Sequence, residues 1–308
     1  MNDSRDIAPE TATSRLELMW GQAGLDRLRR SLVVVLGVGG VGSNCVEALV
    51  RGGVGRLVIV DGDEVAPSNI NRQAIAFVDT VGKRKVEAMR DLIARINPEA
   101  EVSPIDVFLK AENVPALMDG IISKQGMPAY VVDAIDTVSA KLAVASWAAE
   151  RGVPLISSMG GAMKLDPSKL RVCDLFETAN DPLARVMRKE CRKRGIDRLT
   201  VLSSFEEPMR RPGGAARAGR QAGAPKAPLG TASYLPPIMG QMIAGHVIRS
   251  IIDGAQAKGQ GRARGTEAGG APAGGQPATS HPDEAAAAPA LRLRTHEPAS
   301  MPAGNRKA

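Results

Sequence analysis

The chain has 308 residues and a formal net charge of +7, and 44% of its residues are hydrophobic although only 3% are aromatic. This length suffices for one large or two small domains, with a core built mainly from aliphatic side chains. Residues 1–15 contain no apolar signal segment, and no stretch has the roughly 20 apolar residues that a membrane helix needs. The three cysteines form no CxxC pair, so we expect a reduced, cytoplasmic location and no membrane contact.

Helical and strand-like patterns alternate along most of the chain. Apolar residues at helical spacing predict helices over 14–28, 44–51, 81–96, 111–123, 140–151, 184–194 and 235–252. Short apolar runs predict strands over 32–36, 54–60, 101–108, 129–135, 154–158, 170–175 and 199–203. The alternation is typical of an α/β, Rossmann-like, doubly wound fold with a mainly parallel sheet and flanking helices. After residue 160 the pattern changes, which predicts a C-terminal extension of strands plus a helix.

Three stretches lack this periodicity. We expect residues 1–13 and the Gly/Ala/Pro-rich residues 253–308 to be disordered. Residues 207–228 are rich in Arg, Gly, Ala and Pro, which favours a mobile loop. The interpretation is one domain over residues 14–252 with disordered ends.

Residues 31–63 have the features of a nucleotide-binding βαβ unit. Two strands flank a helix, and the turn before the helix contains Gly37, Gly39, Gly40 and Gly42. Gly37 permits the tight turn, Gly39 and Gly40 let phosphate approach the backbone, and Gly42 lets helix and sheet pack closely. Asp61, about 20 residues on, is placed to accept hydrogen bonds from ribose hydroxyls. The alternative is a glycine turn that binds no ligand.

Charged side chains gather at the same predicted sheet edge. The loop after the second strand contains Ser68, Asn69, Asn71, Arg72 and Gln73. Because loops at the carboxyl ends of parallel strands converge on one crevice, Arg72 and Lys85 can both reach a triphosphate. Asp136 follows the fourth strand and can hold Mg²⁺, which prefers carboxylate and phosphate oxygens. This set suits attack on a phosphorus atom, where fixed positive charge stabilises growing negative charge.

Each of these residues also has a plainer interpretation. Arg72 and Lys85 can be solvated surface charges. Asp133 and Asp136 can cap the following helix, and Asp63 can be a turn former.

A second group of charges lies in and after the helix predicted over 184–194. The helix contains Arg185, Arg188, Lys189, Arg192, Lys193 and Arg194. Arg198, Arg210, Arg211, Arg217 and Arg220 extend the charge, and Arg292, Arg294, Arg306 and Lys307 lie in the tail. Such residues bind nucleic-acid phosphates without sequence choice. A solvated face is the alternative.

Several ordered motifs resemble the adenylating fold of the ubiquitin-activating-enzyme superfamily (the ThiF, MoeB and HesA group). They are GVGGVGS at 37–43, DGD at 61–63, SNINRQ at 68–73, VGKRKVE at 81–87 and DAID at 133–136. A closer similarity is to the tRNA threonylcarbamoyladenosine dehydratase family. It is carried by DAIDTVSAK at 133–141, SMGGAMKLDPSKLRVCDL at 158–175 and TANDPLARVMRKECRKRG at 178–195. That family uses ATP to close a ring on a modified adenosine beside the tRNA anticodon.

The resemblance implies a role for each matching residue. Asp136 holds Mg²⁺ and is the candidate essential acid, and Arg72 and Lys85 are catalytic with it. The implied ATP-binding residues are Arg15, Gly37, Gly39, Gly40, Gly42, Asp61, Asp63, Ser68, Asn69, Arg72, Gln73 and Lys85. The implied tRNA-binding residues are Arg188, Lys189, Arg192, Lys193 and Arg194. Arg15 resembles an arginine lent to the neighbour's ATP across a dimer interface, which implies a homodimer.

The expected activity is therefore ATP-dependent cyclisation of N6-threonylcarbamoyladenosine in tRNA, through adenylation of its carboxylate. The alternatives are an activator of a sulfur-carrier or ubiquitin-like protein, a nicotinamide-dependent oxidoreductase and a non-catalytic nucleotide sensor. The chain lacks the paired CxxC zinc motifs of many sulfur-carrier activators, so we expect no metal beyond Mg²⁺. Cys173 is interpreted as a small buried hydrophobe, and Cys191 as either that or a reactive thiol. A sulfur-relay partner is left open.

Overall fold

The computed structural model describes residues 10–209 and 229–263. These residues belong to one compact unit, Met1–Arg264. The predictions made for residues 1–9, 210–228 and 264–308 lie outside the described residues.

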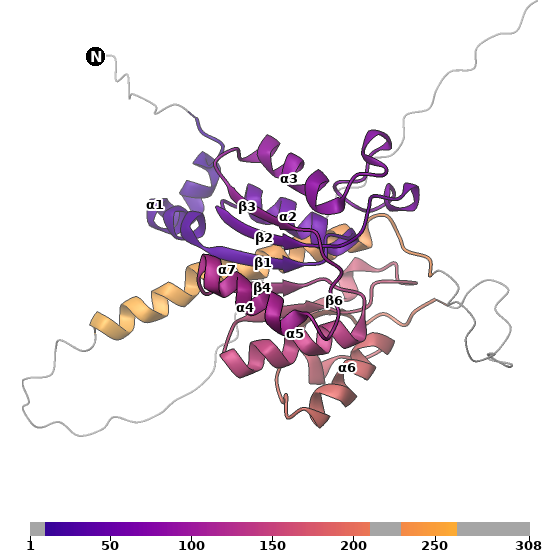
Figure 1. Ribbon diagram of the computed structural model, residues 1–308. Helices are drawn as coiled ribbons and strands as arrows, with labels where there is room; N and C mark the ends of the chain where they lie inside the picture. The colour runs from indigo at the N-terminus through magenta and orange to yellow at the C-terminus, as the bar shows by residue number, and fades with distance from the viewer. Residues whose placement is uncertain (1–9, 210–228, 264–308) are drawn as a thin grey trace, which may run out of the picture. The chain divides into compact units, whose positions relative to one another are not determined.

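A seven-stranded sheet with the order β3-β2-β1-β4-β5-β7-β6 lies at the centre of the unit (Figure 1). Its strands are β1 (Leu32–Leu36), β2 (Arg56–Val60), β3 (Glu101–Ile105), β4 (Tyr130–Asp133), β5 (Leu155–Ser158), β6 (Leu170–Asp174) and β7 (Thr200–Ser204). Every neighbouring pair is parallel except β6 and β7. The chain order changes direction between β1 and β4, which is where ligands bind in doubly wound sheets. The expected α/β fold with a mainly parallel sheet is confirmed.

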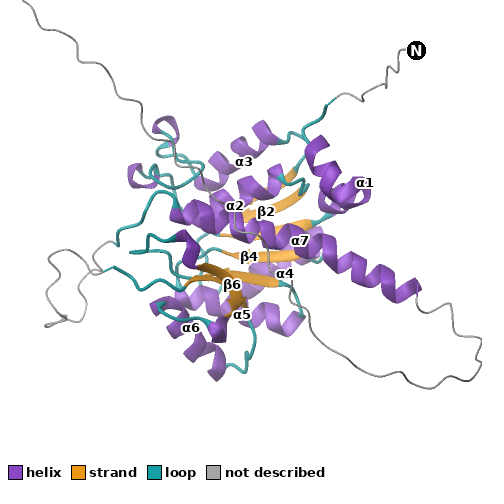
Figure 2. Cartoon of the chain, turned by 180° about the vertical axis from the view of Figure 1, so that it is seen from behind, coloured by secondary structure: helices purple, strands orange, loops and turns teal. Residues whose placement is uncertain are grey.

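Helices cover both faces of this sheet (Figures 1 and 2). One core contains residues of α2 (Gly40–Arg51), α3 (Lys85–Ile96) and α7 (Leu235–Ala263), with α1 (Ser14–Arg30) at its edge. The other contains residues of α4 (Val114–Gln125), α5 (Val138–Arg151) and α6 (Pro182–Lys193). Alternate residues of β1 enter the two cores, with Val33 and Val35 in the first and Val34 in the second. This explains why β1 reads as an unbroken apolar run.

Several predicted helix boundaries were wrong, and most of these differences lie at glycines. We expected a helix from residue 81, but α3 begins at Lys85, because Gly82 has a φ of 87°. α2 begins at Gly40 rather than at residue 44, so part of the glycine turn is helical. α1 is interrupted at Gly21, where φ is 64°. α7 continues to Ala263 instead of ending at residue 252.

The polar segment after β2 was expected to be a loop, and it contains two short 3-10 helices, η1 (Pro67–Asn69) and η2 (Val78–Thr80). Within residues 10–209 and 229–263, no helix combines the length and the apolar character that crossing a bilayer requires.

The glycine turn is packed too tightly for larger residues. A Cβ on Gly42 would lie 1.8 Å from the carbonyl oxygen of Gly37. Gly37 itself has a φ of +91°, and a Cβ there would lie 2.7 Å from the carbonyl oxygen of Ala134. The turn, the first turn of α2 and the loop after β4 are therefore in direct backbone contact.

Gly42→Ala is expected to destabilise the fold by about 1–3 kcal/mol, because the added methyl forces α2 away from the turn. The measurement is urea unfolding followed by circular dichroism. The control is Gly120→Ala in α4, where a Cβ meets nothing within 4 Å. The control is expected to be neutral or slightly stabilising, and equal losses in both variants would contradict the packing argument.

Candidate active site

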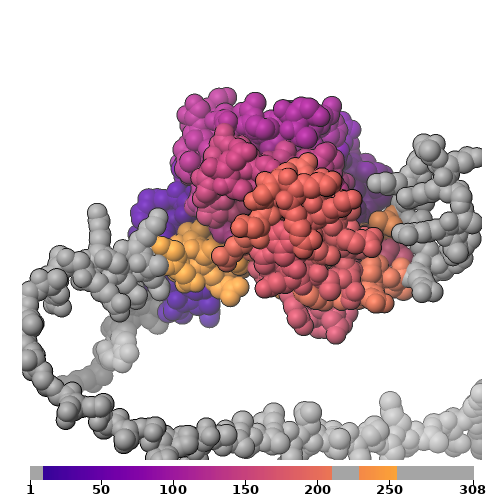
Figure 3. All heavy atoms as spheres, turned by 90° about the horizontal axis from the view of Figure 1, so that it is seen from below, coloured from indigo at the N-terminus to yellow at the C-terminus, as the bar shows by residue number. Residues whose placement is uncertain are grey.

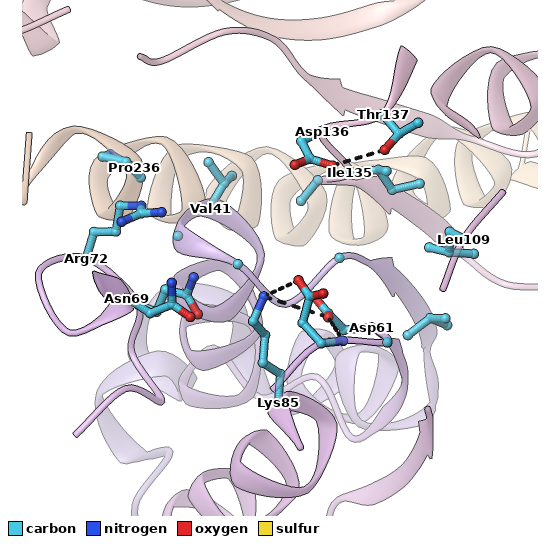
Figure 4. A pocket seen from close by; sticks show the side chains of 18 of the residues that line it. Val41, Asp61, Asn69, Arg72, Lys85, Leu109, Ile135, Asp136, Thr137 and Pro236 are labelled. Carbon is cyan, nitrogen blue, oxygen red and sulfur yellow. Dashed lines mark hydrogen bonds and ion pairs between the residues drawn. The ribbon is translucent and has the colours of Figure 1, made fainter. Parts of the chain in front are cut away.

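A cavity of about 560 Å³ opens at the carboxyl edge of the sheet, beside the glycine turn. Figure 4 shows side chains from both halves of the sheet facing it. The expected site residues that line it are Gly37, Gly39, Gly40, Asp61, Asp63, Asn69, Arg72, Gln73, Lys85 and Asp136. Residues from five segments of the chain thus meet at one place, as the doubly wound fold predicts.

The carboxylate of Asp61 organises one wall of the cavity. Its Oδ2 accepts a hydrogen bond from the backbone N–H of Val38 at 2.7 Å, and its Oδ1 accepts one from Asp63 N–H at 2.8 Å. The Nζ of Lys85 lies 2.7 Å from Asp63 Oδ2 and 3.8 Å from Asp61 Oδ1. Lys85 is 6% exposed, so it is not the solvated surface charge of the plainer interpretation.

Arg72 forms the adjacent wall. Its Nη1 donates to the carbonyl oxygen of Ser68 at 3.0 Å and to Asn71 Oδ1 at 2.8 Å. A Cβ on Gly40 would lie 3.2 Å from Arg72 Cγ, so the arginine packs directly on the glycine turn. The guanidinium has five N–H donors, and it keeps donors for a ligand while these two contacts hold it in place.

The amide side chains of Asn69 and Gln73, in the same segment, differ in their hydrogen bonding. The Oδ1 of Asn69 accepts a hydrogen bond from the backbone N–H of Ala66, which fixes its orientation. Gln73 is 7% exposed and lines the cavity, and its Oε1 has no hydrogen-bond partner in the described part of the chain. Ser68 is not among the lining residues, and it contributes its carbonyl group to Arg72 instead.

Asp136 lies across the cavity from Lys85 and Asp61 (Figure 4). Its carboxylate is exposed and accepts one hydrogen bond, from Thr137 Oγ1 at 3.2 Å. The expectation that Asp133 or Asp136 caps the next helix is wrong, because Thr137 precedes α5 and no side chain caps it. Asp133 is instead fully buried and pairs with Lys141.

The sequence analysis missed several lining residues, among them Val107, Phe108 and Leu109. They follow β3, which ends at Ile105 rather than at residue 108. The predicted strand therefore concealed a loop at the carboxyl edge. Pro104 lies inside this strand. Because proline is confined to edge strands, to first strand positions or to bulges, it is the sequence signal that could have indicated a short edge strand.

Arg15 does not reach this cavity within its own chain. Its side chain is 86% exposed on α1 and pairs with Glu10 at 3.4 Å. Gly42 does not line the cavity either, because its role is the close packing described above.

The predicted tRNA-binding residues of α6 are largely engaged within the chain. Arg188 donates to the carbonyl oxygen of Thr178, and Arg192 lies over the ring of Phe176 at 5.1 Å. Lys193 and Arg194 pair with Glu190 at 2.8 and 2.9 Å, which lowers the pKa of that carboxyl to about 2. Lys189 is exposed and has no such partner in residues 10–209 or 229–254.

The thiols do not form a reactive group. Cys45 and Cys191 are buried, and burial raises the pKa of both. Burial also raises the pKa of the partly exposed Cys173. Because the thiolate is the nucleophile, the hypothesis of a reactive Cys191 is not supported.

The fold and the cavity define a nucleotide-binding α/β protein with cations placed around a phosphate-binding turn. Residues 13–267 match the ThiF family, and the chain belongs to it. It is 39% identical over 253 residues to the tRNA threonylcarbamoyladenosine dehydratase of Bacillus subtilis, covering 80% of this chain and 96% of that protein. The enzyme of the same name from Escherichia coli is 37% identical over 171 residues, which cover 56% of this chain and 62% of that protein.

A solved structure of the Escherichia coli enzyme in complex with ATP has the same fold. It matches with a TM-score of 0.69 and 29% identity, covering 80% of this chain and 96% of that one. The molybdopterin-synthase adenylyltransferase of Salmonella typhimurium is 34% identical over a shorter span, 46% of this chain. The similarity to the dehydratases therefore extends beyond the nucleotide-binding part.

Lys85→Met is expected to lower turnover about 100-fold, because it removes a buried cation at the phosphate-binding wall. Initial rates of ATP consumption at saturating substrate measure the change. Lys83→Met is the matched control, since Lys83 is exposed and is not among the lining residues. A loss of similar size in both variants would argue against a specific role for Lys85.

Proposed function

We propose that this chain is an ATP-dependent tRNA threonylcarbamoyladenosine dehydratase that adenylates the substrate carboxylate and then releases AMP on ring closure. The observation that carries the proposal is the cavity itself. It gathers the glycine turn, Arg72, Lys85 and Asp136 in a chain 39% identical to an enzyme of that name. We further propose residues 14–252 as the adenylating domain.

The cavity walls suit ATP, which the Escherichia coli relative binds. The free N–H groups at the start of α2 and the positive end of its dipole attract phosphate. Each Asp61 oxygen retains a lone pair, so the carboxylate can also accept ribose hydroxyls. Arg72 and Lys85 are placed to neutralise the outer phosphates. The apolar loop of Val107 and its neighbours offers a surface for the adenine ring.

Asp136 fits the expected Mg²⁺. The residues 10–209 and 229–254 hold no group of three or more acidic, histidine or cysteine side chains that could bind a metal. Mg²⁺ usually takes one or two carboxylates, with substrate phosphates and water completing its shell. The exposed Asp136 carboxylate, which has no cation partner among the described residues, supplies such a ligand. When bound there, Mg²⁺ would offset charge on the phosphates.

A free carboxylate is a poor acylating agent because its oxygen is a poor leaving group. The carboxylate must therefore be activated before the ring can close. A substrate carboxylate oxygen attacks the α-phosphorus, the bond to the β-phosphate breaks and pyrophosphate leaves. A nucleophile of the same threonylcarbamoyl side chain then attacks the acyl carbon, and AMP departs with the former carboxylate oxygen. The net change in the nucleoside is loss of one water. Arg72 and Lys85 stabilise the developing phosphate charge, and the internal attack benefits from proximity.

The exposed surface of α1 supports the proposed homodimer. Leu18 and Met19 are 85% and 68% exposed there, beside the equally exposed Arg15. Exposed apolar side chains of this kind favour a protein interface. A second copy seated on α1 would cover them and bring Arg15 toward a neighbouring cavity.

The test is incubation with ATP, Mg²⁺ and tRNA from cells that lack the activity, followed by mass analysis of the digested nucleosides. The proposal predicts that threonylcarbamoyladenosine loses the mass of one water. Asp136→Ala is expected to abolish this change while it keeps the wild-type melting temperature, and near-normal activity would reject its role. Pyrophosphate release that only a carrier protein's C-terminus stimulates would favour the sulfur-carrier activator instead.

The basic helix α6 begins next to the cavity and supports tRNA as the substrate. Asp181, its N-cap, accepts hydrogen bonds from Leu183 N–H and also from Gly160 N–H at 2.9 Å. Gly160 directly precedes Gly161, which lines the cavity. The salmon surface in Figure 3, which includes α6, faces outward. tRNA bound along α6 would therefore lie beside the nucleotide.

The pairing within α6 predicts unequal contributions to tRNA binding. Lys189→Glu is expected to weaken tRNA binding several-fold and to reduce the salt dependence of the affinity, because it removes a cation that has no partner among the described residues. Lys193→Glu is expected to weaken it less, since Glu190 already offsets that charge. Filter binding at several salt concentrations measures both, and a larger effect of Lys193→Glu would refute this order.

A further inference from the structure

The chain contains a fully buried ion pair next to the loop after β4, which carries the candidate catalytic residue Asp136. Lys141 Nζ lies 3.0 Å from Asp133 Oδ2, and the two side chains are 0% and 1% exposed. A buried pair of this kind adds little net stability, because desolvation of both charges offsets their attraction. Its position under the Asp136 loop suggests that it serves the site.

The ion pair forms hydrogen bonds to both backbone polar groups of one residue, Ile135. Asp133 Oδ1 accepts a hydrogen bond from Ile135 N–H at 3.1 Å. Lys141 Nζ donates to the carbonyl oxygen of Ile135 at 3.0 Å. The remaining oxygen of the aspartate accepts the hydroxyl of Ser157 at 2.6 Å, which ties the pair to β5.

This arrangement determines the direction of the next residue. Ile135 immediately precedes Asp136, whose side chain faces the cavity across from Lys85 (Figure 4). Within the part of the chain that the structure describes, the Asp136 side chain has one hydrogen bond, from the hydroxyl of the neighbouring Thr137. The side-chain contacts of Asp136 therefore do not fix its backbone, whereas the buried pair below does.

We propose that Asp133 and Lys141 are positioning residues, a buried clamp on Ile135 that aims the Asp136 carboxylate into the nucleotide cavity. The inference rests on the proposed function of Asp136. It predicts that a loosened clamp leaves nucleotide affinity nearly intact and lowers the rate of the chemical step. A displacement of about 1 Å in a catalytic group can cost up to roughly 100-fold in rate.

The test uses the double substitution Asp133→Asn/Lys141→Met. Removing Lys141 alone strands a buried charge and threatens folding, whereas the double variant removes both charges. An asparagine oxygen still accepts the Ile135 N–H, and the asparagine N–H₂ can donate to the Ser157 hydroxyl oxygen, so the contact that is lost is the donor to the Ile135 carbonyl. The control is Arg56→Met/Glu101→Gln, which removes a partly exposed ion pair of 3.1 Å between β2 and β3, away from the cavity.

We expect hydrogen–deuterium exchange in the peptide 133–140 to become roughly tenfold faster in the double variant, with little change elsewhere. The kcat is expected to fall roughly 10- to 100-fold while the KM for ATP stays within about threefold. The control variant should keep wild-type exchange in that peptide and wild-type kcat.

Unchanged exchange in the peptide 133–140 would overturn the clamp. Faster exchange with wild-type kcat would overturn its positioning role. Parallel loss of kcat, ATP affinity and melting temperature would mark the pair as merely structural, and it would likewise overturn the proposal. A wild-type protein that does not dehydrate the tRNA nucleoside would instead refute the proposed function, while the exchange result would still test the clamp.

Discussion

The carboxylate of Asp61 is the group on which the cavity depends. It joins three parts of the chain that come together only in the folded state. One oxygen holds the glycine turn through Val38 N–H, and the other holds the end of β2 through Asp63 N–H. The buried Lys85 at the start of α3 lies 3.8 Å from it. Because these contacts are all made within the protein, they hold the phosphate-binding wall in one arrangement, which reduces the cost of ordering it on binding.

The charges around the cavity are balanced unevenly. Lys85 is offset by two acids on its own wall, whereas the contacts of Arg72 among the described residues are to neutral oxygens. Arg72 is therefore the less neutralised of the two cations at the cavity wall.

The parts of the fold that could be predicted depend on local chemistry. β1 was predicted with its observed bounds, because a short β-branched run before a glycine turn has few other solutions. The start of α3 was not, because a backbone angle at Gly82 ended the helical pattern. The insertion of β7 between β5 and β6 has no local signal at all, since it depends on pairing between segments far apart in the chain.

The same limit applies to the acids of the motif at 133–136. In sequence, Asp136 alone was assigned the Mg²⁺ role, while both Asp133 and Asp136 could cap the following helix, and spacing did not reveal that Asp133 is buried. The structure separates them by burial, because β4 is an interior strand and its last residue lies inside the protein. A buried carboxylate requires a cation and hydrogen-bond donors, which Lys141 and Ser157 supply. The outer acid needs no such partners and stays available to a ligand. Asp133 is therefore an acid of the protein interior, whereas Asp136 stays exposed at the cavity.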